Sequence, residues 1–547
     1  MRPLRREKFL LPKSVAAVLV FVFCLVSLAA ADFPEEVLAA KRSISGRMVV
    51  SHIHFLASKY CRGREPGDIG MEVADQYITS VLNGAGLTPA GDFGSYFQQV
   101  KLKKVSLSDR IHLQVVEGSG GTPVIRDAVL DADYLPIIIS GEREVTAPVV
   151  FAGYGITAPE HNYDDYKNLN VKGRIVLVLR HEPGENDDNS PFEGRTLSKY
   201  GTILSKILNA QKHGAVGILF VTGPLNHKDT SLDGAGFFSG TNWPSLQKKR
   251  KKNDEDFKYM TFRERWRIIG ADFGVKIPAV LIDGALADEL LGENQNLKDI
   301  QAGMDKNLKP NSFPLFDKKV SMQVYFNNEP VAAHNIVAKV EGSDPVLKDE
   351  IVIVGGHYDH LGKDNRGQVN FGADDNASGT SAVLELARAF QNMEVKPKRT
   401  IIFILFTAEE KGLLGARYYA DHPLLPLEKT IAMFNLDMIG RNDISQLSML
   451  GKYQYPKLFK IVDDVNKKSA NFELNFNVEA SVRNSDQFPF MRANVPVAFF
   501  ISGLHDQYHT PRDTVDRIVT EKVEKVAQMV FLALWETANL PAGTTLK

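Results

Sequence analysis

EIVIVGGHYDH, residues 350–360, is the stretch that decides the fold. Its first half is a run of β-branched apolar residues that ends in two glycines, a pattern typical of a strand buried on both faces. Polar residues follow at once, because His357, Asp359 and His360 stand where the strand should end. We therefore expect a buried strand that carries metal-competent side chains at its carboxyl end.

The same pattern recurs through the second half of the chain, where short apolar runs alternate with helical patterns. The further strands that we expect lie at 400–406, 430–436 and 495–501, and the helices at 380–391, near 457–467 and at 521–538. Such alternation predicts an α/β fold with a mostly parallel sheet that helices cover on both faces. Ligands of these sheets bind beyond the carboxyl ends of the strands.

Acidic residues and histidines stand at each of these strand ends and in the turn before the first helix. They are Asp374, Asp375, Glu409, Glu410, Asp437, His505 and His509, with Tyr508 beside the last of them. One such placement is easily explained by chance, but five in a row are not. The carboxyl edge of the sheet is therefore where we expect the chemistry.

This set of residue types fits a pair of divalent metal ions. Two metals close together need one bridging carboxylate and a terminal histidine or carboxylate set on each side. Imidazole and carboxylate without thiolate suit zinc, cobalt or manganese at a catalytic site. Of the adjacent Glu409 and Glu410, one can bind metal while the other stays free as a general base. Three histidines without comparable context, His54, His360 and His422, are interpreted as structural.

Composition excludes several classes of protein. The chain has 547 residues, with 65 Lys plus Arg against 66 Asp plus Glu, and this balance argues against a polyanion-binding protein. Its two cysteines cannot form a disulfide framework or a Cys-rich zinc module. The basic run Lys248–Lys252 is followed by Asp254, Glu255 and Asp256, which favours a solvated loop over a nucleic-acid or anionic-lipid patch.

The N-terminus is typical of a secretory signal peptide, residues 1–31. Five basic residues precede the apolar stretch Val15–Ala31, which ends in three alanines. Cleavage would change the formal net charge from -1 to -5 and leave Cys61 as the one remaining cysteine. We expect a secreted or periplasmic protein without stable membrane insertion; the alternative is an uncleaved membrane anchor.

The residue patterns divide the mature chain into three parts. We expect an N-terminal part of the catalytic domain at 32–140, a separate unit at 141–295 and the metal-binding part of the catalytic domain at 325–547. The middle part contains short β-branched runs bounded by glycine and proline, such as GRIVLVL (173–179) and AVGILFV (215–221). It is interpreted as an insert in a discontinuous catalytic domain.

Five motifs carry a resemblance to a known family. GGHYDHLG, GADDNASGTSAVLELAR, FTAEEKGLLGA, NLDMIGR and YHTPRDT resemble, in order, the ligand motifs of the co-catalytic di-zinc aminopeptidase family, metallopeptidase family M twenty-eight. This family also includes glutamate carboxypeptidases and glutaminyl cyclases. The resemblance covers about 330–540 and the N-terminal segment, and residues 141–295 look like an inserted, smaller and β-rich protease-associated domain. It implies that the expected α/β fold has a mixed, mostly parallel sheet sandwiched by helices.

The resemblance implies a set of ligands for two zinc ions. His357 and Asp437 would bind one ion, Glu410 and His509 the other, and Asp375 would bridge them. Asp375 rather than its neighbour Asp374 matches the bridging position, which is the fourth residue of the GADD stretch. The peptide bond after it is often cis in relatives.

The resemblance also implies roles beyond metal binding. Glu409 matches the general base, Asp359 matches the carboxylate that orients the histidine ligand, and Tyr508 would stabilise the tetrahedral oxyanion. Many relatives have Ser-Asp-His where this chain has Ser485-Asp486-Gln487, a departure that bears on substrate contacts.

The implied activity is that of a zinc aminopeptidase acting on peptides. The nearest alternative is a glutamate-carboxypeptidase-like enzyme, which needs an arginine cluster for the substrate's C-terminal carboxylate. Candidate arginines are Arg441, Arg483, Arg492 and Arg512. Glutaminyl cyclases normally lack the insert, and non-catalytic receptor-like relatives lose metal ligands that are all present here. No nucleic-acid partner is expected.

Overall fold

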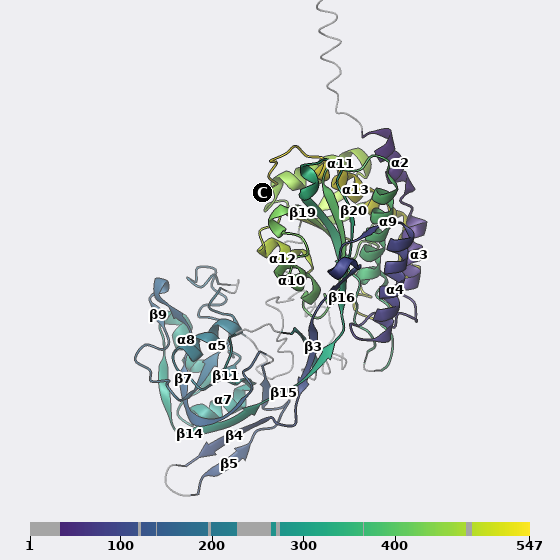
Figure 1. Cartoon of the computed structure of the whole chain (residues 1–547). Helices are drawn as coiled ribbons and strands as arrows, with labels where there is room; N and C mark the ends of the chain where they lie inside the picture. The colour runs from purple at the N-terminus through teal and green to yellow at the C-terminus, as the bar shows by residue number, and fades with distance from the viewer. Residues whose placement is uncertain are drawn as a thin grey trace, which may run out of the picture.

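The structure is a computed structural model and describes residues 33–118, 122–137, 139–194, 198–226, 264–269, 274–364, 366–476 and 484–546. The expected signal peptide and the Lys248–Lys252 run lie outside these ranges. Within them, no helix combines the length and the apolar character that a membrane span requires. Two units joined by a narrow β-ribbon make up the described chain (Figure 1).

The larger unit is built on a nine-stranded mixed sheet, in the order β1-β16-β18-β17-β19-β22-β20-β21 with β2 also paired to β16. Its four central strands, β18, β17, β19 and β22, are parallel. The strands are β1 (Thr88–Pro89), β2 (Phe97–Gln99), β16 (His334–Val340), β17 (Ile351–His357), β18 (Thr400–Phe406), β19 (Thr430–Leu436), β20 (Gln446–Leu450), β21 (Glu473–Asn475) and β22 (Val497–Ile501). The prediction of a mixed, mostly parallel central sheet is confirmed.

Helices cover this sheet on both sides (Figure 1). One layer contains α2 (Glu35–Ser43), α3 (Gly46–Leu56), α4 (Ile69–Gly84), α9 (Gly379–Asn392) and α13 (Thr520–Ala538), which pack against one another. The other side carries α10 (Leu414–Asp421) and α12 (Gln487–Arg492), and α11 (Pro456–Ser469) packs against α13.

Local sequence explains where these helices begin and what they bury. Asp68 caps the start of α4 by accepting a hydrogen bond from the main chain of Gly70 at 2.8 Å. The apolar stripe expected in the last helix, which includes Val523 and Val530, is fully buried in the core of the larger unit. Burial of this stripe holds α13 on the sheet, as its helical period predicts.

The smaller unit has its own eight-stranded sheet, in the order β5-β4-β14-β7-β10-β11-β13-β6, and its own apolar core. β7, β10, β11 and β13 are parallel, β6 and β14 flank them as antiparallel neighbours, and β14, β4 and β5 pair antiparallel with one another. The strands are β4 (His112–Glu117), β5 (Val124–Asp127), β6 (Tyr134–Pro136), β7 (Arg143–Ala152), β10 (Ile175–Leu179), β11 (Gly217–Val221), β13 (Ala279–Ile282) and β14 (Ser312–Val324), with helices α5 (Ile203–Lys212), α7 (Gly284–Leu291) and α8 (Leu297–Asn307).

This second sheet draws on more of the chain than the expected range 141–295. β4, β5 and β6 precede that range and β14 follows it, yet all four pair within the same sheet. We propose that the smaller unit extends over about 108–325 and that the larger unit is formed by the segments on either side. The sequence argument placed the segments of β4, β5 and β6 in the N-terminal part of the catalytic domain, because their pairing partners are distant in the chain.

A three-stranded ribbon connects the units, in the order β12-β3-β15 (Figure 1). Its strands are β3 (Leu102–Leu107), β12 (Glu264–Ile268) and β15 (Phe326–Val331). At the larger unit the ribbon ends in a small apolar cluster of Val100, Leu102, Ala333, Ala408 and Leu414. The ribbon is therefore packed directly beneath the turn that follows β18.

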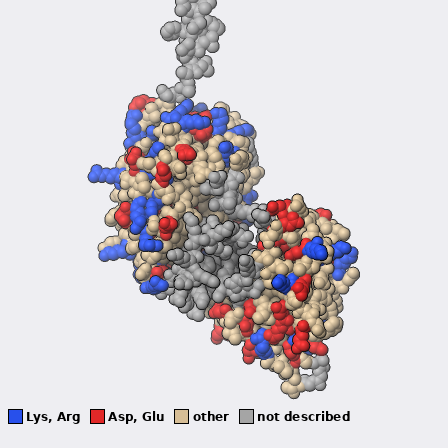
Figure 2. Space-filling view, turned by 180° about the vertical axis from the view of Figure 1, so that it is seen from behind, with Lys and Arg blue, Asp and Glu red and all other residues tan. Residues whose placement is uncertain are grey.

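Charged side chains are distributed differently over the two units. Lys and Arg are interspersed with Asp and Glu over the larger unit, whereas acidic side chains gather on the lower part of the smaller unit (Figure 2).

Candidate metal centre

The parallel strands of the larger unit bring the expected polar residues to one edge of the sheet. His357 is the last residue of β17, and Asp437 directly follows β19. Glu409 and Glu410 lie in the turn after β18, and His509 in the loop after β22. Because parallel strands end at the same edge, residues as distant in the chain as His357 and His509 meet there.

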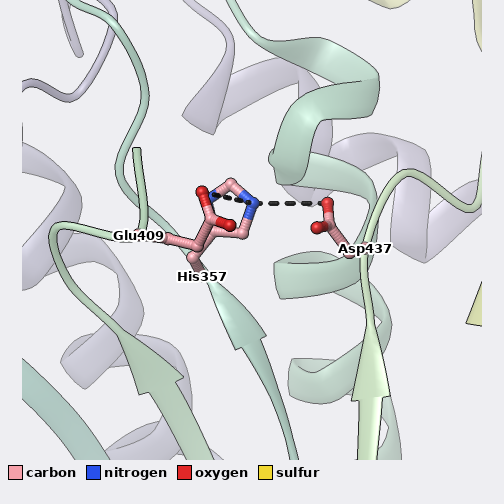
Figure 3. A group of neighbouring side chains, drawn as sticks. All are labelled: His357, Glu409 and Asp437. Carbon is pink, nitrogen blue, oxygen red and sulfur yellow. Dashed lines mark hydrogen bonds and ion pairs between the residues drawn. The ribbon is translucent and has the colours of Figure 1, made fainter. Parts of the chain in front are cut away.

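One group of side chains is centred on His357. Its Nε2 atom lies 3.3 Å from Oδ1 of Asp437 and 3.9 Å from Oε2 of Glu409 (Figure 3). The ligand atoms of these three residues lie within 4.8 Å of one another, a spacing that one metal ion can span. All three side chains are at most 10% exposed.

A second group is centred on Glu410. Nδ1 of His360 lies 2.8 Å from its Oε1 atom, and Nε2 of His509 lies 3.2 Å from its Oε2 atom. His360, Asp375 and Glu410 also have ligand atoms within 4.8 Å of one another. The side chain of His509 is 24% exposed, so the second group lies nearer to solvent.

Asp375 lies between the two groups. Its Oδ1 atom is 3.4 Å from Nε2 of His357, and its Oδ2 atom is 3.1 Å from Nε2 of His509. The two oxygens of one carboxylate thus face histidines of different groups, as a bridging ligand requires.

Asp374 points elsewhere. Its Oδ1 atom accepts a hydrogen bond from the main chain of Gly440 at 2.7 Å, and its Oδ2 atom lies 3.4 Å from Nε2 of His505. Adjacent aspartates therefore serve different parts of the structure. The peptide bond between Asp375 and Asn376 is cis.

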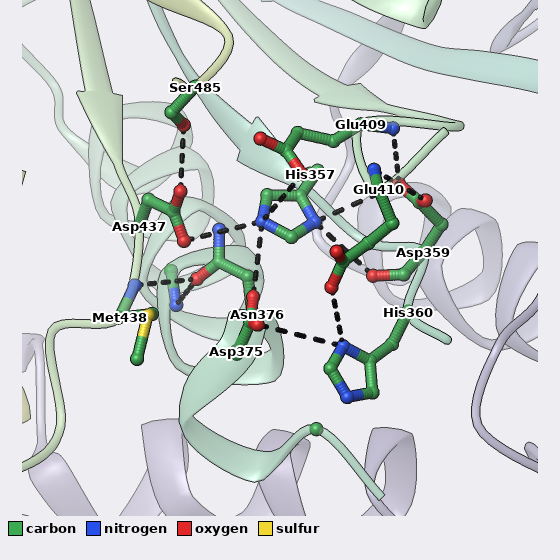
Figure 4. A network of polar contacts seen from close by, with 12 residues as sticks. His357, Asp359, His360, Asp375, Asn376, Glu409, Glu410, Asp437, Met438 and Ser485 are labelled. Atoms are coloured by element: carbon green, nitrogen blue, oxygen red, sulfur yellow. Dashed lines mark hydrogen bonds and ion pairs between the residues drawn. The ribbon is translucent and has the colours of Figure 1, made fainter. Parts of the chain in front are cut away.

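Asp359 holds the turn that carries the two glutamates. Its carboxylate accepts hydrogen bonds from the main-chain N–H groups of Glu409, at 3.0 Å, and Glu410, at 3.3 Å (Figure 4). Nδ1 of His357 lies 3.2 Å from the carbonyl oxygen of Asp359 and 3.7 Å from its carboxylate. Of the two groups of Asp359, the carbonyl therefore lies closer to this nitrogen than the carboxylate does.

Asp437 is held by a chain of buried hydrogen bonds that sequence reasoning did not predict. The hydroxyl of Ser485 donates to its Oδ2 atom at 2.7 Å (Figure 4). The amide of Asn435 in turn donates to Ser485 at 2.9 Å and to Gln487 at 2.8 Å. Gln487 is fully buried and accepts one of these hydrogen bonds from Asn435.

Tyr508 lies beside the second group. Its ring stacks on the imidazole of His509 with centroids 3.7 Å apart. Its main-chain N–H donates to the carbonyl of His505 at 3.0 Å, which shapes the loop that carries both residues.

The two adjacent glutamates differ in acidity. Burial raises the pKa of Glu409 well above its usual value, and the nearby carboxylates of Glu410 and Asp486 add to the increase. Burial acts in the same direction on Glu410, but His509 and His360 overcome it and hold its pKa well below the usual value. A low pKa suits a metal ligand, and a raised pKa suits a proton acceptor that must later release its proton.

The residues present fit zinc. Oδ2 of Asp375 and Nε2 of His509 are buried and face each other without a hydrogen bond, which leaves two donor atoms pointing into one space. Carboxylate and imidazole are the ligands of catalytic zinc sites. A cation between these groups would satisfy atoms that the protein itself leaves without a partner.

Of the histidines interpreted as structural, His360 differs from the other two in its surroundings. It is fully buried and contacts Glu410, whereas His54 and His422 are exposed. The interpretation of His360 as structural stays a prediction, and its contact with Glu410 places it next to the candidate ligands. Only the bend of the chain after β17 turns its side chain toward Glu410.

Comparison with known proteins agrees with this architecture. Residues 335–534 match the model of Peptidase family M28, and residues 145–245 match the PA domain. The chain therefore contains a peptidase family M28 domain and, within the same polypeptide, a PA domain.

Two curated relatives and one solved structure illustrate the similarity. Aminopeptidase YwaD of Bacillus subtilis (strain 168) is 33% identical over 228 residues, 39% of this chain and 46% of the relative. A probable zinc metalloprotease of Pyrenophora teres f. teres (strain 0-1) is 43% identical over 244 residues, 40% of this chain and 51% of the relative. The structure of an aminopeptidase from Aneurinibacillus sp. strain AM-1 matches with a TM-score of 0.52 and 21% identity, over 93% of this chain and 97% of the other.

The sequence matches and the structural match cover different shares of the proteins compared. The chain spans about half the length of the curated relatives that it matches. The structural match extends over nearly the whole of both chains and concerns the fold.

Proposed function

We propose that this protein is a zinc-dependent exopeptidase that removes N-terminal amino acids from peptides. The proposal rests on the position of Asp375. Its two oxygens face His357 and His509, which belong to separate groups of ligands. The family match and the names of the curated relatives support a metallopeptidase activity.

We assign the ligands of two zinc ions as follows. His357 and Asp437 hold one ion, Glu410 and His509 hold the other, and Asp375 bridges them; cobalt or manganese are possible substitutes. When bound, two such ions polarise a carbonyl oxygen and lower the pKa of a water molecule. His360 would orient Glu410 through the contact of 2.8 Å between the two side chains.

Glu409 is the general base in this proposal. Its carboxylate accepts the proton of the attacking water and passes it to the leaving amine. Burial and the surrounding carboxylates raise its pKa, which favours the acceptance of the proton. Asp359 fixes the main chain of the turn by accepting hydrogen bonds from the N–H groups of Glu409 and Glu410.

Tyr508 would donate a hydrogen bond to the oxyanion that develops on the scissile carbonyl. Its position next to His509 supports this role, since stacking of the two rings limits the movement of the phenol. Donors placed in advance at such a position are worth several kcal/mol in related chemistry, about 3 for one donor.

The glutamate-carboxypeptidase-like alternative depends on arginines that recognise a C-terminal carboxylate. Arg441 is engaged with the protein, because its Nη2 atom donates to Gln507 at 2.6 Å and its Nη1 atom lies 3.8 Å from Asp513. Arg492 and Arg512 are exposed, and Arg483 lies outside the described residues. This distribution favours the aminopeptidase, and the presence of all five ligands disfavours a non-catalytic receptor.

A panel of peptides tests the proposal. Zinc-loaded full-length protein should release the first residue of peptides with a free amino terminus and leave N-blocked peptides intact. The Glu409→Gln variant, purified in the same way, controls for contaminating peptidases. Release of C-terminal residues from N-blocked peptides would overturn the aminopeptidase assignment in favour of the carboxypeptidase.

The proposed substrates are peptides. The proposed location of the protein is outside the cell or in the periplasm. We propose cleavage after Ala31, on the pattern of residues 1–31. N-terminal sequencing of the protein exported by its host should begin at Asp32, and a chain that keeps its apolar segment would instead be anchored.

A further inference from the structure

Asp513 is a buried carboxylate close to the metal centre that binds no metal in the assignment above. It lies four residues after His509 and is 0% exposed. Its main-chain N–H donates to the carbonyl of Thr510 at 3.1 Å, so it belongs to the turn that directly follows the His509 ligand.

The carboxylate of Asp513 binds the main chain of the neighbouring turn. It accepts hydrogen bonds from the N–H of Asp374, at 3.0 Å and 3.2 Å, and from the N–H of Asp375, at 3.1 Å. The N–H of Ala373 donates to the carbonyl oxygen of Asp513 at 3.2 Å. Three consecutive N–H groups of the turn are thus bound by one residue.

The turn needs such a partner because it is not a regular helix. Asp375 has φ -104° and ψ 97°, and Asn376 has φ -126° and ψ 44°, ahead of the start of α9 at Gly379. N–H groups at this position have no carbonyl one turn earlier to accept them. A buried N–H without an acceptor is costly, and an ionised acceptor gives a stronger bond than a neutral one.

Asp513 also contacts the segment after Asp437. Nη1 of Arg441 lies 3.8 Å from its Oδ1 atom, and Nη2 of the same guanidinium donates to Gln507 at 2.6 Å. Three segments that carry assigned ligands therefore meet around one carboxylate: the Asp375 turn, the Asp437 loop and the His509 loop.

We propose that Asp513 is a positioning residue that holds Asp375 between the two zinc positions and keeps it in register with His509. The inference rests on the proposed function, since it concerns the same zinc ligands. Outer groups that orient metal ligands typically contribute about 10- to 100-fold in metal affinity or activity. A purely structural role would lower the stability of the fold but leave the affinity of the folded protein for zinc unchanged.

The test measures zinc binding rather than peptide hydrolysis. Full-length wild type and Asp513→Asn are stripped with a chelator, and zinc affinity and stoichiometry are measured by competition with a chromophoric chelator. Thermal unfolding without metal is recorded in parallel. Asp516→Asn, an exposed aspartate three residues later, is the matched control.

We expect Asp513→Asn to bind both zinc ions about 10- to 100-fold more weakly, while Asp516→Asn binds like wild type. Wild-type affinity in folded Asp513→Asn would overturn the inference, even if its unfolding temperature fell. If Asp513→Asn does not accumulate in folded form, Asp513→Glu replaces it, since this variant keeps the charge and displaces it by one methylene; undiminished affinity there overturns the inference equally.

The outcomes separate this inference from the proposed function. A wild-type chain that binds two zinc ions but cleaves no peptide overturns the proposed function, and the comparison with Asp513→Asn still decides the role of Asp513. A wild-type chain that binds no zinc overturns both.

Discussion

Nδ1 of His360 lies 2.8 Å from Oε1 of Glu410, and both side chains are buried at the edge of the central sheet. Figure 4 shows this imidazole on the side of Glu410 away from His357. The pair is the part of the candidate metal centre that residue patterns did not reveal. It therefore offers a direct test of how the second metal position is organised.

Replacement of His360 by alanine should weaken zinc at the second position. Without the imidazole, the carboxylate of Glu410 loses the group that fixes its orientation, and we expect zinc affinity to fall about 10- to 100-fold at one of two sites. Metal titration followed by competition with a chelator measures the two affinities. His422→Ala, an exposed histidine, is the control, and equal affinities in the two variants would exclude His360 from the centre.

Replacement of Glu409 by glutamine should abolish turnover without removing zinc. Glutamine keeps the shape of the side chain but cannot accept the proton of water, so kcat should fall by about 10²- to 10⁴-fold. Metal content and peptide release are measured on the same preparation, with exposed Glu428→Gln as control. Loss of one zinc together with activity would instead make Glu409 a metal ligand, which its distance of 3.9 Å from Nε2 of His357 allows.

Replacement of Asp375 by alanine should release both zinc ions together, because its two oxygens serve both positions. Asp374→Ala should keep both ions and cost about 1–3 kcal/mol of stability, since the buried N–H of Gly440 loses its acceptor. Elemental analysis after gel filtration, combined with chemical denaturation, distinguishes the two variants. Two tightly bound zinc ions in Asp375→Ala would transfer the bridging role to Asp374.

Arg64 binds main-chain carbonyls near the same edge of the sheet. Its guanidinium is fully buried and donates at 2.6–2.8 Å to four carbonyls, those of Leu56, Tyr358, Phe371 and Gly372. Arg64→Met removes the guanidinium donors of these four carbonyls and should cost at least about 3 kcal/mol of stability. Arg62→Met, which breaks a half-exposed ion pair with Asp68, should cost at most about 1 kcal/mol. Equal losses in denaturant unfolding would contradict this account.

The smaller unit should show a pH-dependent stability that originates at Asp165. Its fully buried carboxylate accepts hydrogen bonds from the main chain of Tyr154 and Ile156 and from the hydroxyl of Tyr163. Burial raises the pKa of Asp165 from 3.8 to about 7, against the opposing effect of these hydrogen bonds and of Lys206.

The sign of this effect follows from proton binding. Between about pH 4 and pH 7 the folded protein holds a proton at Asp165 that the unfolded chain releases, so the contribution to stability decreases as the pH rises. Asp165→Asn removes this pH dependence. Relative to wild type, its free energy of unfolding should therefore increase between pH 4 and pH 7, by about 4 kcal/mol at most. Denaturant unfolding at pH 5 and pH 8 measures the difference, and a constant difference between the two proteins would contradict the assignment.

Local patterns predicted much of the fold and of the candidate centre. Thr400–Phe406 and Thr430–Leu436 have the same bounds in the sequence argument and in the structure, because strands buried on both faces leave continuous apolar runs. The extent of the second sheet was not predictable in the same way. β14 pairs with β4 about 200 residues earlier, and a bulge between Pro314 and Lys319 interrupts its pattern.

The order of apolar strands and the polar residues at their ends follow from the sequence alone, since burial requires apolar side chains and parallel strands end at one edge. The orientation of those polar residues depends on the tertiary structure. Asp374 and Asp375 are adjacent and chemically identical, and they face different partners because Asp513, 138 residues after Asp375, binds the main chain between them. Long-range hydrogen bonds of this kind leave no periodic trace, so only the folded chain decides which carboxylate faces the metal positions.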